Sequence, residues 1–371
     1  MLKEGELRIP AGCAISGIID KKGNRFGGQE IIKSIALMHD RSNGLGGGFA
    51  AYGIYPQYKD LFALHIFYDD LNIKMQTEEF LARHFDIESA GNIPTSQVPT
   101  VKNKPLIWRY FVHPRTYMVK EGFMDDKEFT ARCVIRINKE YTGAYVFSSG
   151  KNMGVFKGVG YPEDIGEFFM LDTYEAYMWT AHGRFPTNTP GWWGGAHPFT
   201  MLNWSVVHNG EISSYDANRR FVEMFGYKCT LQTDTEVITY LFDLLIRKHG
   251  LPIEKAIEIM VAPFWDDIEK VNKDLQNELK SLRAVYSSAL INGPFSIILG
   301  YEKGMIALND RIKLRSLVAA EKGDRTYVAS EESAIRIICA DPERVWLPRG
   351  GEPVVALLED DIQGGQNEHR F

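Results

Sequence analysis

Four short segments of the sequence carry residue types that could do chemistry together. Cys13 stands at the head of an apolar run, HGRFPTNT spans 182–189, HNGEI spans 208–212 and QTDTEV spans 232–237. A thiol is the best side-chain nucleophile near neutral pH, which makes Cys13 a candidate for covalent catalysis. Taken singly, the other three segments have ordinary structural interpretations. An Asn-Gly pair usually forms a turn, an acid before an apolar run usually caps a helix, and an arginine beside a histidine usually makes an ion pair.

The four cysteines are spaced in a way that excludes the common metal and cluster motifs. No two of them form a CxxC pair, so neither a zinc site nor an iron–sulfur cluster is expected. Widely spaced cysteines of an intracellular chain are usually buried and unreactive, which is our expectation for Cys133, Cys229 and Cys339. No GxGxxG segment leads from a strand into a helix and no GxxxxGK[ST] occurs, so no nucleotide site is predicted.

The order and spacing of the four segments resemble the class II (Ntn-type) glutamine amidotransferases. Chains of that family begin with cysteine and carry an H-T-R strand, an H-N-G turn and a [ST]-D-[ST]-E helix start. Further matches extend the resemblance from Cys13 to about residue 358. They are Arg41 before a glycine-rich turn, AHPF at 196–199, and the C-terminal stretches GPFSIILGYEKGMIALNDRIKLRSL and RTYVASEESAIR.

Within this class the chain is most similar to glutamate synthase. The similarity lies in RFPTNT, HNGEI and SSGKNMGVFKGVG, and in the long stretch between Arg41 and Arg184. The chain lacks the flavin-binding barrel and the cysteine cluster of a full-length glutamate synthase large chain. It therefore resembles the stand-alone amidotransferase subunit of a split glutamate synthase. That resemblance implies a glutaminase that hydrolyses L-glutamine and delivers ammonia to a partner subunit carrying FMN and iron–sulfur, with no cofactor and no metal in this chain.

The resemblance assigns catalytic roles to Cys13, Asn209, Gly210 and Arg41. Cys13 would be the nucleophile and its own free α-amino group the general base, because an α-amine titrates at roughly 7.7–8.0, near working pH. The Asn209 side-chain amide and the Gly210 N–H would form the oxyanion hole. Glycine at 210 would let the backbone approach the substrate closely, so this residue also belongs to the substrate site. Arg41 would order the surroundings of the nucleophile.

A free amino acid has two charged ends, and the resemblance supplies a partner for each. Arg184 would bind the α-carboxylate, since a guanidinium can hold a carboxylate through two hydrogen bonds. Asp234, at the start of a predicted helix, would bind the α-ammonium, and the helix N-terminus would favour its charge. Thr187 would complete the substrate site. His182 and His197 lie in matching motifs, but we expect them to pack or hydrogen-bond rather than to catalyse.

The sequence departs from the family pattern at two places. The H-T-R strand is here His182-Gly183-Arg184, which should be tolerated because the middle side chain is not a ligand. Residues 1–12 precede Cys13, and an acylated Cys13 nitrogen cannot act as a base. We expect residues 1–12 to be a pro-segment that is removed. Two alternatives stay open: an amidotransferase for another acceptor, and a non-catalytic Ntn-fold subunit if residues 1–12 are retained.

Four predicted elements must position the candidate residues. A strand at 13–19 carries Cys13 at its head, and a strand at 174–185 ends around Arg184. A strand at 205–208 leads directly into Asn209 and Gly210. The fourth element is a helix at 234–248, whose first residue is Asp234.

The remaining elements predict the fold class. Strands come first, helices follow in the middle and hairpin-like strands close the chain, which argues for stacked sheets covered by helices rather than alternating βαβ units. We expect a helix at 126–139 capped by Asp126, and a loop at 89–105. The resemblance makes this expectation of stacked sheets specific: it implies an α+β fold, a four-layer αββα Ntn-hydrolase sandwich of two mainly antiparallel sheets. Residues 13–371 would form one domain with a long insertion within about 52–175.

The composition limits the partners of the protein. The 371 residues are 44% hydrophobic and 24% charged, with a net charge of −6, as is typical of a soluble globular protein. Such a charge does not favour nucleic-acid binding. The apolar runs are too short to span a membrane, and the first twelve residues lack the apolar centre of a secretory signal. We expect a cytoplasmic protein that binds L-glutamine and a partner subunit, and neither nucleic acid nor membrane.

Overall fold

The strand that follows Cys13 lies near the middle of a seven-stranded sheet. The computed structural model describes residues 12–122, 124–185 and 191–359. Strand β1 (Ala14–Asp20) is buried along its whole length between β16 and β10, which explains its nearly continuous apolar sequence. The strand order is β17-β15-β16-β1-β10-β3-β8, and all the pairings are antiparallel. The other six strands are β3 (Gly47–Tyr52), β8 (Met153–Gly158), β10 (Met178–Gly183), β15 (Val318–Lys322), β16 (Arg325–Ala329) and β17 (Arg344–Trp346).

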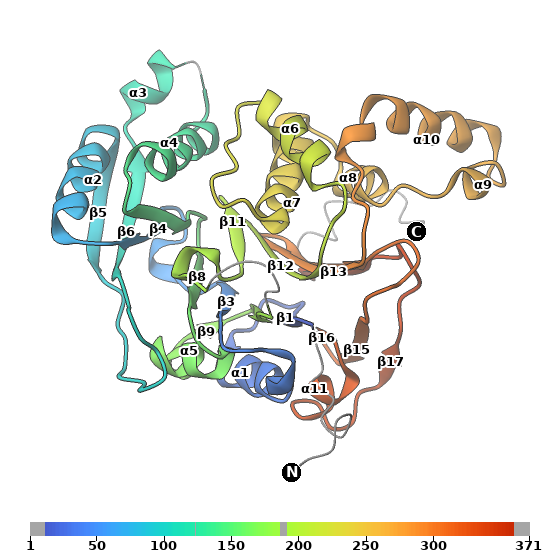
Figure 1. The fold of residues 1–371 in the computed structure, drawn as a ribbon, viewed down its shortest axis with the longest axis horizontal. Helices are drawn as coiled ribbons and strands as arrows, with labels where there is room; N and C mark the ends of the chain where they lie inside the picture. Colours follow the sequence, from blue (N-terminus) through green and yellow to red (C-terminus); the bar gives the residue numbers. More distant parts are fainter. Residues whose placement is uncertain (1–11, 123, 186–190, 360–371) are drawn as a thin grey trace, which may run out of the picture.

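A second, five-stranded antiparallel sheet stacks on the first (Figure 1). The two sheets approach closely at Gly17 of β1, where a Cβ atom would lie 2.6 Å from the sulfur of Met305. A larger residue here would force the Met305 side chain to shift, so glycine favours this close packing. The strand order is β11-β12-β13-β14-β18. These strands are β11 (Phe199–Met201), β12 (Trp204–Gly210), β13 (Phe295–Tyr301), β14 (Gly304–Asn309) and β18 (Val354–Leu357).

Helices cover the outer face of each sheet and complete four layers. On the seven-stranded sheet, α1 (Gln29–Ala36) buries Ile31 and Ile35, and α5 (Pro162–Phe168) packs beside it. On the five-stranded sheet, α7 (Asp234–Phe242) buries nearly every side chain. The predicted αββα sandwich of two antiparallel sheets is thus confirmed. The other helices of these layers are α6 (Tyr215–Met224), the π-helical continuation of α7 (Asp243–Lys248), α8 (Ile253–Met260), α9 (Trp265–Ile268), α10 (Lys273–Val285) and α11 (Glu332–Arg336).

A third sheet lies within the stretch predicted as an insertion. Its strand order is β5-β6-β4-β7, and its side chains share one hydrophobic core with α7 and β13, through residues such as Tyr110, Val237 and Ile297. The insertion sheet is therefore packed against the layer that carries Asp234. Its elements are β4 (Phe62–Tyr68), α2 (Leu71–His84), β5 (Phe85–Asn92), β6 (Leu106–Pro114), α3 (Thr116–Glu121), α4 (Asp126–Glu140) and β7 (Ala144–Ser148).

Three local expectations were wrong. The expected loop at 89–105 begins with the end of β5, whose outward face is mostly polar and therefore gave no apolar pattern. The cap of α4 is Asp125 rather than Asp126, because the Asp125 carboxylate accepts the Glu128 N–H at 2.7 Å. The helix expected at 266–285 is interrupted between α9 and α10, where Asn272 caps the second helix.

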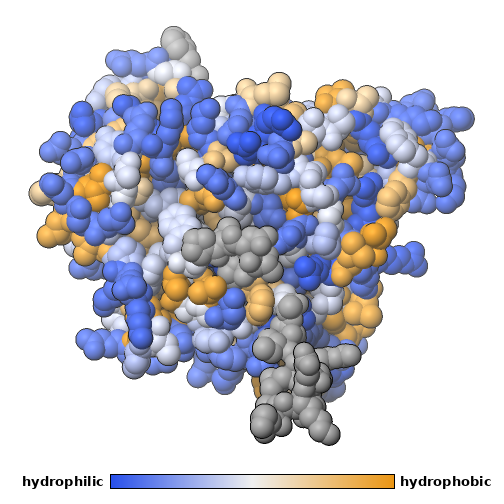
Figure 2. All heavy atoms as spheres, in the orientation of Figure 1, coloured by the Kyte–Doolittle hydropathy of each residue, from blue (hydrophilic) through white to orange (hydrophobic). Residues whose placement is uncertain are grey.

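Within residues 12–122, 124–185 and 191–359, no helix is both long and apolar enough to cross a bilayer. On the face shown in Figure 2, hydrophilic residues predominate and apolar ones occur in small scattered groups. The longest helices and strands belong to the sandwich and its insertion.

Candidate active site

One cleft lies at the start of β1, at the ends of β10 and β12, and at the start of α7. Its volume is about 640 Å³, and four predicted site residues line it: Cys13, Arg184, Gly210 and Asp234. Asn209 precedes Gly210 on β12 and is fully buried. Arg41, in the short helix His39–Arg41, contacts the Cys13 carbonyl. Thr187 lies outside the described residues.

Cys13 is half-buried and its thiol is held in place from one side. The backbone N–H of Phe185 donates to the Cys13 sulfur at 3.3 Å. Burial raises the pKa of the thiol above its ordinary value, although the Phe185 N–H and the guanidinium groups of Arg184 and Arg315 act in the opposite direction. The thiol is therefore protonated at rest near neutral pH, and attack on a substrate needs a base.

The end of β12 presents a buried amide without a protein partner. Neither the nitrogen nor the oxygen of the Asn209 side chain makes a hydrogen bond within the described chain. Pairing of Asn209 with Ser296 and of Gly210 with Phe295 fixes the backbone here. Gly210 has φ 147°, and a Cβ at this position would lie 2.0 Å from the Pro294 carbonyl oxygen. Only glycine fits, and its backbone forms part of the cleft wall.

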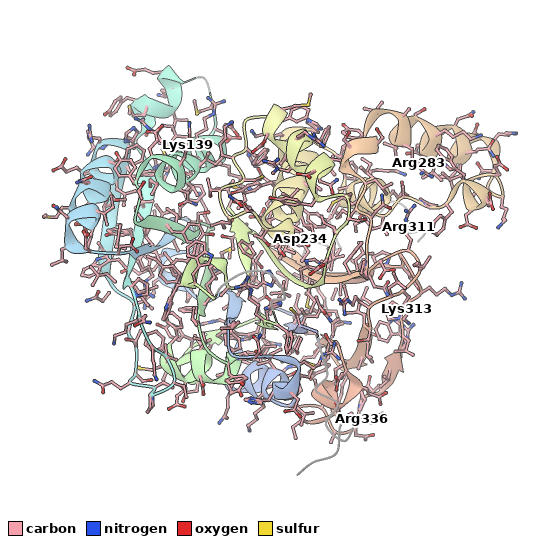
Figure 3. The ribbon with its side chains drawn as sticks, viewed as in Figure 1. Lys139, Asp234, Arg283, Arg311, Lys313 and Arg336 are labelled. Carbon is pink, nitrogen blue, oxygen red and sulfur yellow. The ribbon has the colours of Figure 1, made fainter. Side chains whose placement is uncertain are left out.

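Asp234 forms a fixed negative charge at the start of α7 (Figure 3). Its carboxylate accepts the Ile212 N–H at 3.1 Å and the Thr235 hydroxyl at 3.2 Å, and lies 3.4 Å from Nδ1 of His208. Burial acts to raise the pKa of this carboxyl, but His208 and these hydrogen bonds outweigh burial and hold the pKa below its usual range. Asp234 therefore stays ionised and is suited to bind a cation.

Arg184 places a guanidinium in the same cleft. Its backbone is fixed to the loop that follows the His39–Arg41 helix, because its N–H donates to Gly46 and its carbonyl accepts from Asn43. A Cβ at position 46 would lie 3.0 Å from Cδ of Arg184, so glycine leaves room for the side chain. Burial lowers the pKa of the guanidinium, whereas nearby Cys13 raises it. An arginine stays charged in either case.

Arg41 connects the nucleophile to a neighbouring carboxylate. Its Nε donates to the Cys13 carbonyl at 3.2 Å, and its Nη1 donates to Glu331 at 2.8 Å. These contacts hold the backbone of Cys13 rather than its thiol. The arrangement fits the expected ordering role.

Two of the three histidines near the cleft are buried and neutral. His182 hydrogen-bonds to the His208 carbonyl at 2.9 Å and to Nδ1 of His197 at 2.7 Å. Burial lowers the pKa of His182 to about 3 and places that of His197 well below its ordinary value. Such groups do not exchange protons near neutral pH. The geometry is that of packing residues.

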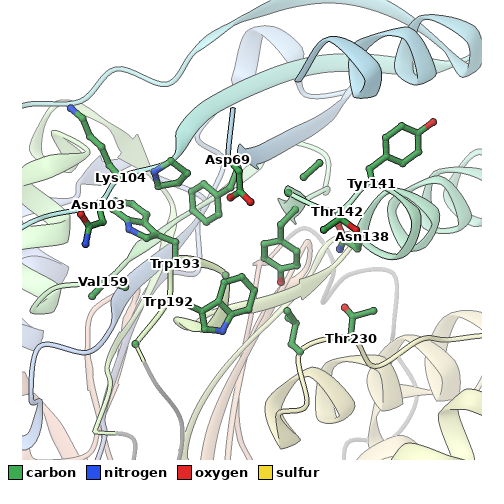
Figure 4. Close-up of a pocket in the computed structure, with 18 of the residues that line it drawn as sticks. Asp69, Asn103, Lys104, Asn138, Tyr141, Thr142, Val159, Trp192, Trp193 and Thr230 are labelled. Carbon is green, nitrogen blue, oxygen red and sulfur yellow. The ribbon is translucent and has the colours of Figure 1, made fainter. Parts of the chain in front are cut away.

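The two tryptophans of the loop before AHPF have different environments. Trp193 is buried, packs on Gly158, and meets the rings of Phe67 and Phe168 at 5.6 and 5.7 Å. Trp192 is 43% exposed and lines both the cleft and a second, larger cavity of about 950 Å³ (Figure 4). Thr230 and Leu231 also line both cavities, so the two are neighbours. Of the pair, only Trp192 lines the cleft.

Some residues at the cleft were not predicted from the sequence. Phe185 contributes only its backbone N–H, so its side-chain type carried no signal. Arg315 reaches the nucleophile from a distant loop, although it lies within a stretch that resembles the family. None of the remaining thiols lines the cleft, and the expectation that all three are buried was wrong for Cys229. Cys133 and Cys339 are buried and Cys229 is half-buried, and burial raises the pKa of Cys133 to about 12. Among the described residues, no group of three or more His, Cys, Asp or Glu side chains is arranged to hold a metal ion.

Comparison with known proteins connects this cleft to a family. The family model for glutamine amidotransferases class-II matches residues 91–347, a range that begins after Cys13 and Arg41. An uncharacterized protein of Archaeoglobus fulgidus is 52% identical over 350 residues, which cover 94% of this chain and 92% of that protein. A protein of Methanothermobacter thermautotrophicus, provisionally named a glutamine amidotransferase, is 26% identical over 334 residues, covering 87% of this chain and 93% of that one.

One solved structure overlaps this chain at low sequence identity. It is described as the allosteric regulatory enzyme of purine biosynthesis and is 15% identical, with a TM-score of 0.44. The match covers 93% of this chain and 47% of that chain. This chain therefore spans about half the length of that enzyme.

Proposed function

Because the chain belongs to the class II glutamine amidotransferases, we propose that it hydrolyses L-glutamine with Cys13 and donates the ammonia to a partner synthase subunit. One observation carries the proposal. A thiol, a buried amide without a partner, a guanidinium and an ionised carboxylate meet in or beside one cleft. These four groups are what hydrolysis of a free amino acid amide requires.

In this proposal the two charged ends of glutamine fix the substrate. Arg184 binds the α-carboxylate and Asp234 the α-ammonium, which presents the side-chain amide to Cys13. The Cys13 sulfur attacks the amide carbon, and the oxyanion that forms accepts hydrogen bonds from the Asn209 amide and the Gly210 N–H. Such donors are worth about 2.7–4 kcal/mol each in a transition state. Loss of ammonia leaves a thioester, and its hydrolysis by water gives glutamate and restores the thiol.

The base in this proposal is the α-amino group of Cys13. Since burial keeps the thiol protonated, the amine would take its proton and later deliver a proton to the leaving ammonia. This role requires that residues 1–12 be removed so that Cys13 becomes the first residue. If they are retained, the chain would instead be a non-catalytic subunit on an Ntn scaffold.

We further propose that the acceptor of ammonia is a split glutamate synthase acting in the cytoplasm. The support is the similarity of HNGEI and SSGKNMGVFKGVG to that enzyme and the long insertion within about 52–175. The partner would carry FMN and iron–sulfur and would reduce 2-iminoglutarate to glutamate, as part of nitrogen assimilation. An amidotransferase for another acceptor is the alternative, because the relatives do not identify the acceptor.

The partner assignment is tested by measuring glutaminase activity in two settings. The kcat for glutamine hydrolysis is compared with and without the flavin and iron–sulfur subunit and 2-oxoglutarate. We expect the partner to raise kcat and to capture the ammonia, since docking would favour the closed state of the Trp192 loop. Equal rates, with all the ammonia released to solvent, would leave a glutaminase and remove glutamate synthase from the proposal.

A further inference from the structure

Arg315 is carried by a loop that is tightly fixed at its base. The Asp310 carboxylate accepts backbone N–H groups from Phe295, Ile312, Leu314 and Arg315, at 2.9–3.3 Å. Ile312 and Leu314 are exposed, so the loop is held by these bonds rather than by a core of its own. Figure 3 shows Arg311 and Lys313 of the same loop. The backbone of Arg315 therefore has a defined position relative to β13.

The Arg315 guanidinium lies against the peptide that leads into the nucleophile. A Cβ built on Gly12 would be 3.4 Å from Nη1 of Arg315, 3.7 Å from Nη2 of Arg41 and 3.9 Å from Oδ1 of Asn209. Two guanidinium groups and the proposed oxyanion-hole amide thus converge on the Gly12–Cys13 link. The oxyanion hole, Arg315 and the amino end of Cys13 form a single cluster.

The two guanidinium groups differ in their charge balance. Arg41 is paired with Glu331 at 2.8 Å. In the described part of the chain, Arg315 lies within ion-pair distance of no carboxylate, and its buried Nε makes no hydrogen bond. A buried donor without a partner is costly. Among the described residues, Arg315 therefore contributes a positive charge that no carboxylate at ion-pair distance cancels.

Three charged groups act on the Cys13 thiol, and only Arg315 would keep its effect once substrate is bound. Arg184 and Arg315 favour the thiolate, Asp234 opposes it, and Arg41 is offset by Glu331. In the proposed function, the α-carboxylate of glutamine neutralises Arg184 and the α-ammonium neutralises Asp234. The positive charge that remains beside the sulfur is that of Arg315.

We propose that Arg315 is a positioning residue that lies at the amino end of Cys13, beside Asn209, and keeps the nucleophile reactive through its positive charge. That the effect of Arg315 on the thiol persists during turnover rests on the proposed function. Its effect on the thiol of the free protein does not, which allows the two ideas to be tested separately.

The test is the pH dependence of Cys13 alkylation in the full chain as purified. Iodoacetamide modification of Cys13 is followed by mass spectrometry between pH 6 and 10 for wild type, R315Q, R315K and K313Q. We expect R315Q to raise the pH midpoint of Cys13 alkylation by about half a pH unit to one pH unit. This shift slows alkylation at pH 7 by about 3- to 10-fold. R315K should restore most of the rate, because it keeps the charge.

K313Q is the matched control, because it removes a positive charge from the same loop and Lys313 is not among the charged groups that act on the Cys13 thiol. A wild-type profile for R315Q would overturn the inference, and so would an equal shift in K313Q. If R315Q does not fold, Arg315→Met retains an unbranched aliphatic stem and carries the same test. A shifted alkylation profile in a protein that does not hydrolyse glutamine would retain the inference and reject the proposed function.

Discussion

Several polar side chains buried in the insertion sheet bond to one another, whereas the Asn209 amide at the end of β12 has no partner in the described chain. In the insertion, the Tyr68 hydroxyl donates to Tyr110 at 3.1 Å, and Tyr110 donates to Glu78 at 2.9 Å. His65 is held between the Val155 carbonyl at 2.9 Å and the Tyr55 hydroxyl at 3.0 Å. These chains leave no bonding capacity for a ligand on the groups that form them.

At the end of β12 the opposite arrangement is found. Both polar atoms of the Asn209 side chain and Nε2 of His208 are buried without a partner in the described chain. Leaving such groups unpaired costs about 1–3 kcal/mol each, a cost that a ligand can offset. The comparison teaches that bonded polar chains stabilise the insertion, whereas the unpaired Asn209 amide is available to a ligand because it lies beside the cleft. Other buried groups without a partner in the described chain, such as Ser148 and Asn309, do not line the cleft.

The largest expected effect comes from removing the thiol. Cys13→Ala should lower glutaminase kcat by at least about 10⁴-fold, because covalent catalysis is lost and only binding remains. Release of ammonia from glutamine is the assay. The matched controls are Cys133→Ala, Cys229→Ala and Cys339→Ala, which should keep full activity. Loss of activity in a control variant that folds, with Cys13→Ala still active, would contradict the assignment.

Removing either charge that holds the substrate should raise the glutamine KM. Leaving one buried charge unpaired typically costs about 2–5 kcal/mol, or roughly 30-fold to several thousandfold. We expect effects of this size for Arg184→Ala and Asp234→Asn in steady-state kinetics. Asp216→Asn removes an exposed carboxylate of α6 and should leave KM unchanged. Wild-type KM values in both site variants would show that these residues do not bind the amino acid.

Two buried asparagines provide the sharpest form of the comparison. Asn209→Ala should lower kcat by about 10²–10³-fold with a smaller change in KM, because the oxyanion exists only in the transition state. Asn218 donates instead to the carbonyls of Ser288 and Leu290, at 2.7 and 3.1 Å. Asn218→Ala should therefore lower the free energy of unfolding and leave kcat near wild type. If both variants lower the free energy of unfolding and neither lowers kcat, Asn209 has no catalytic role distinct from the structural role of Asn218.

The smallest expected effect is on acid stability. Burial lowers the pKa of both His65 and His182 from 6.5 to about 3, so each is neutral in the folded protein. Their contribution is fully present above pH 6.5 and is lost as the pH falls toward 3, since the unfolded chain binds the protons first. The unfolding free energy should drop by about 1.4 kcal/mol per pH unit for each histidine.

Urea unfolding between pH 7.5 and 5 measures this slope. His65→Gln should reduce the slope and leave glutamine hydrolysis intact. His182→Gln should reduce the slope and also impair hydrolysis, because His182 bonds to the His208 carbonyl on the strand that carries Asn209. If the change of unfolding free energy with pH is the same in both variants as in wild type, the pKa values of these histidines are not lowered in the folded protein.

The sequence was informative where a residue's type determines its role. Cys13, Arg184, Gly210 and Asp234 were predicted from motifs, and the structure brings them to one cleft with Asn209 directly behind. The stacked antiparallel sheets followed from the order of strands and helices. Such features are local, so a pattern in the chain can report them.

Other features depend on how distant segments meet. Arg315 becomes relevant only because the Asp310 loop reaches Gly12. The strand β6 was not predicted, because its buried positions do not alternate regularly. The 950 Å³ cavity forms between the insertion sheet and the Trp192 loop, which no single segment describes. These features arise from tertiary contacts rather than from local sequence.

Active-site labelling of the natively produced protein tests the central claim most directly. A glutamine-mimicking diazoketone is allowed to react, and the intact mass and the labelled peptide are then determined. The account predicts one adduct, on Cys13, in a chain whose first residue is Cys13. An adduct on Cys133, Cys229 or Cys339 with Cys13 unmodified, or full activity in a chain that still begins at Met1, would contradict it.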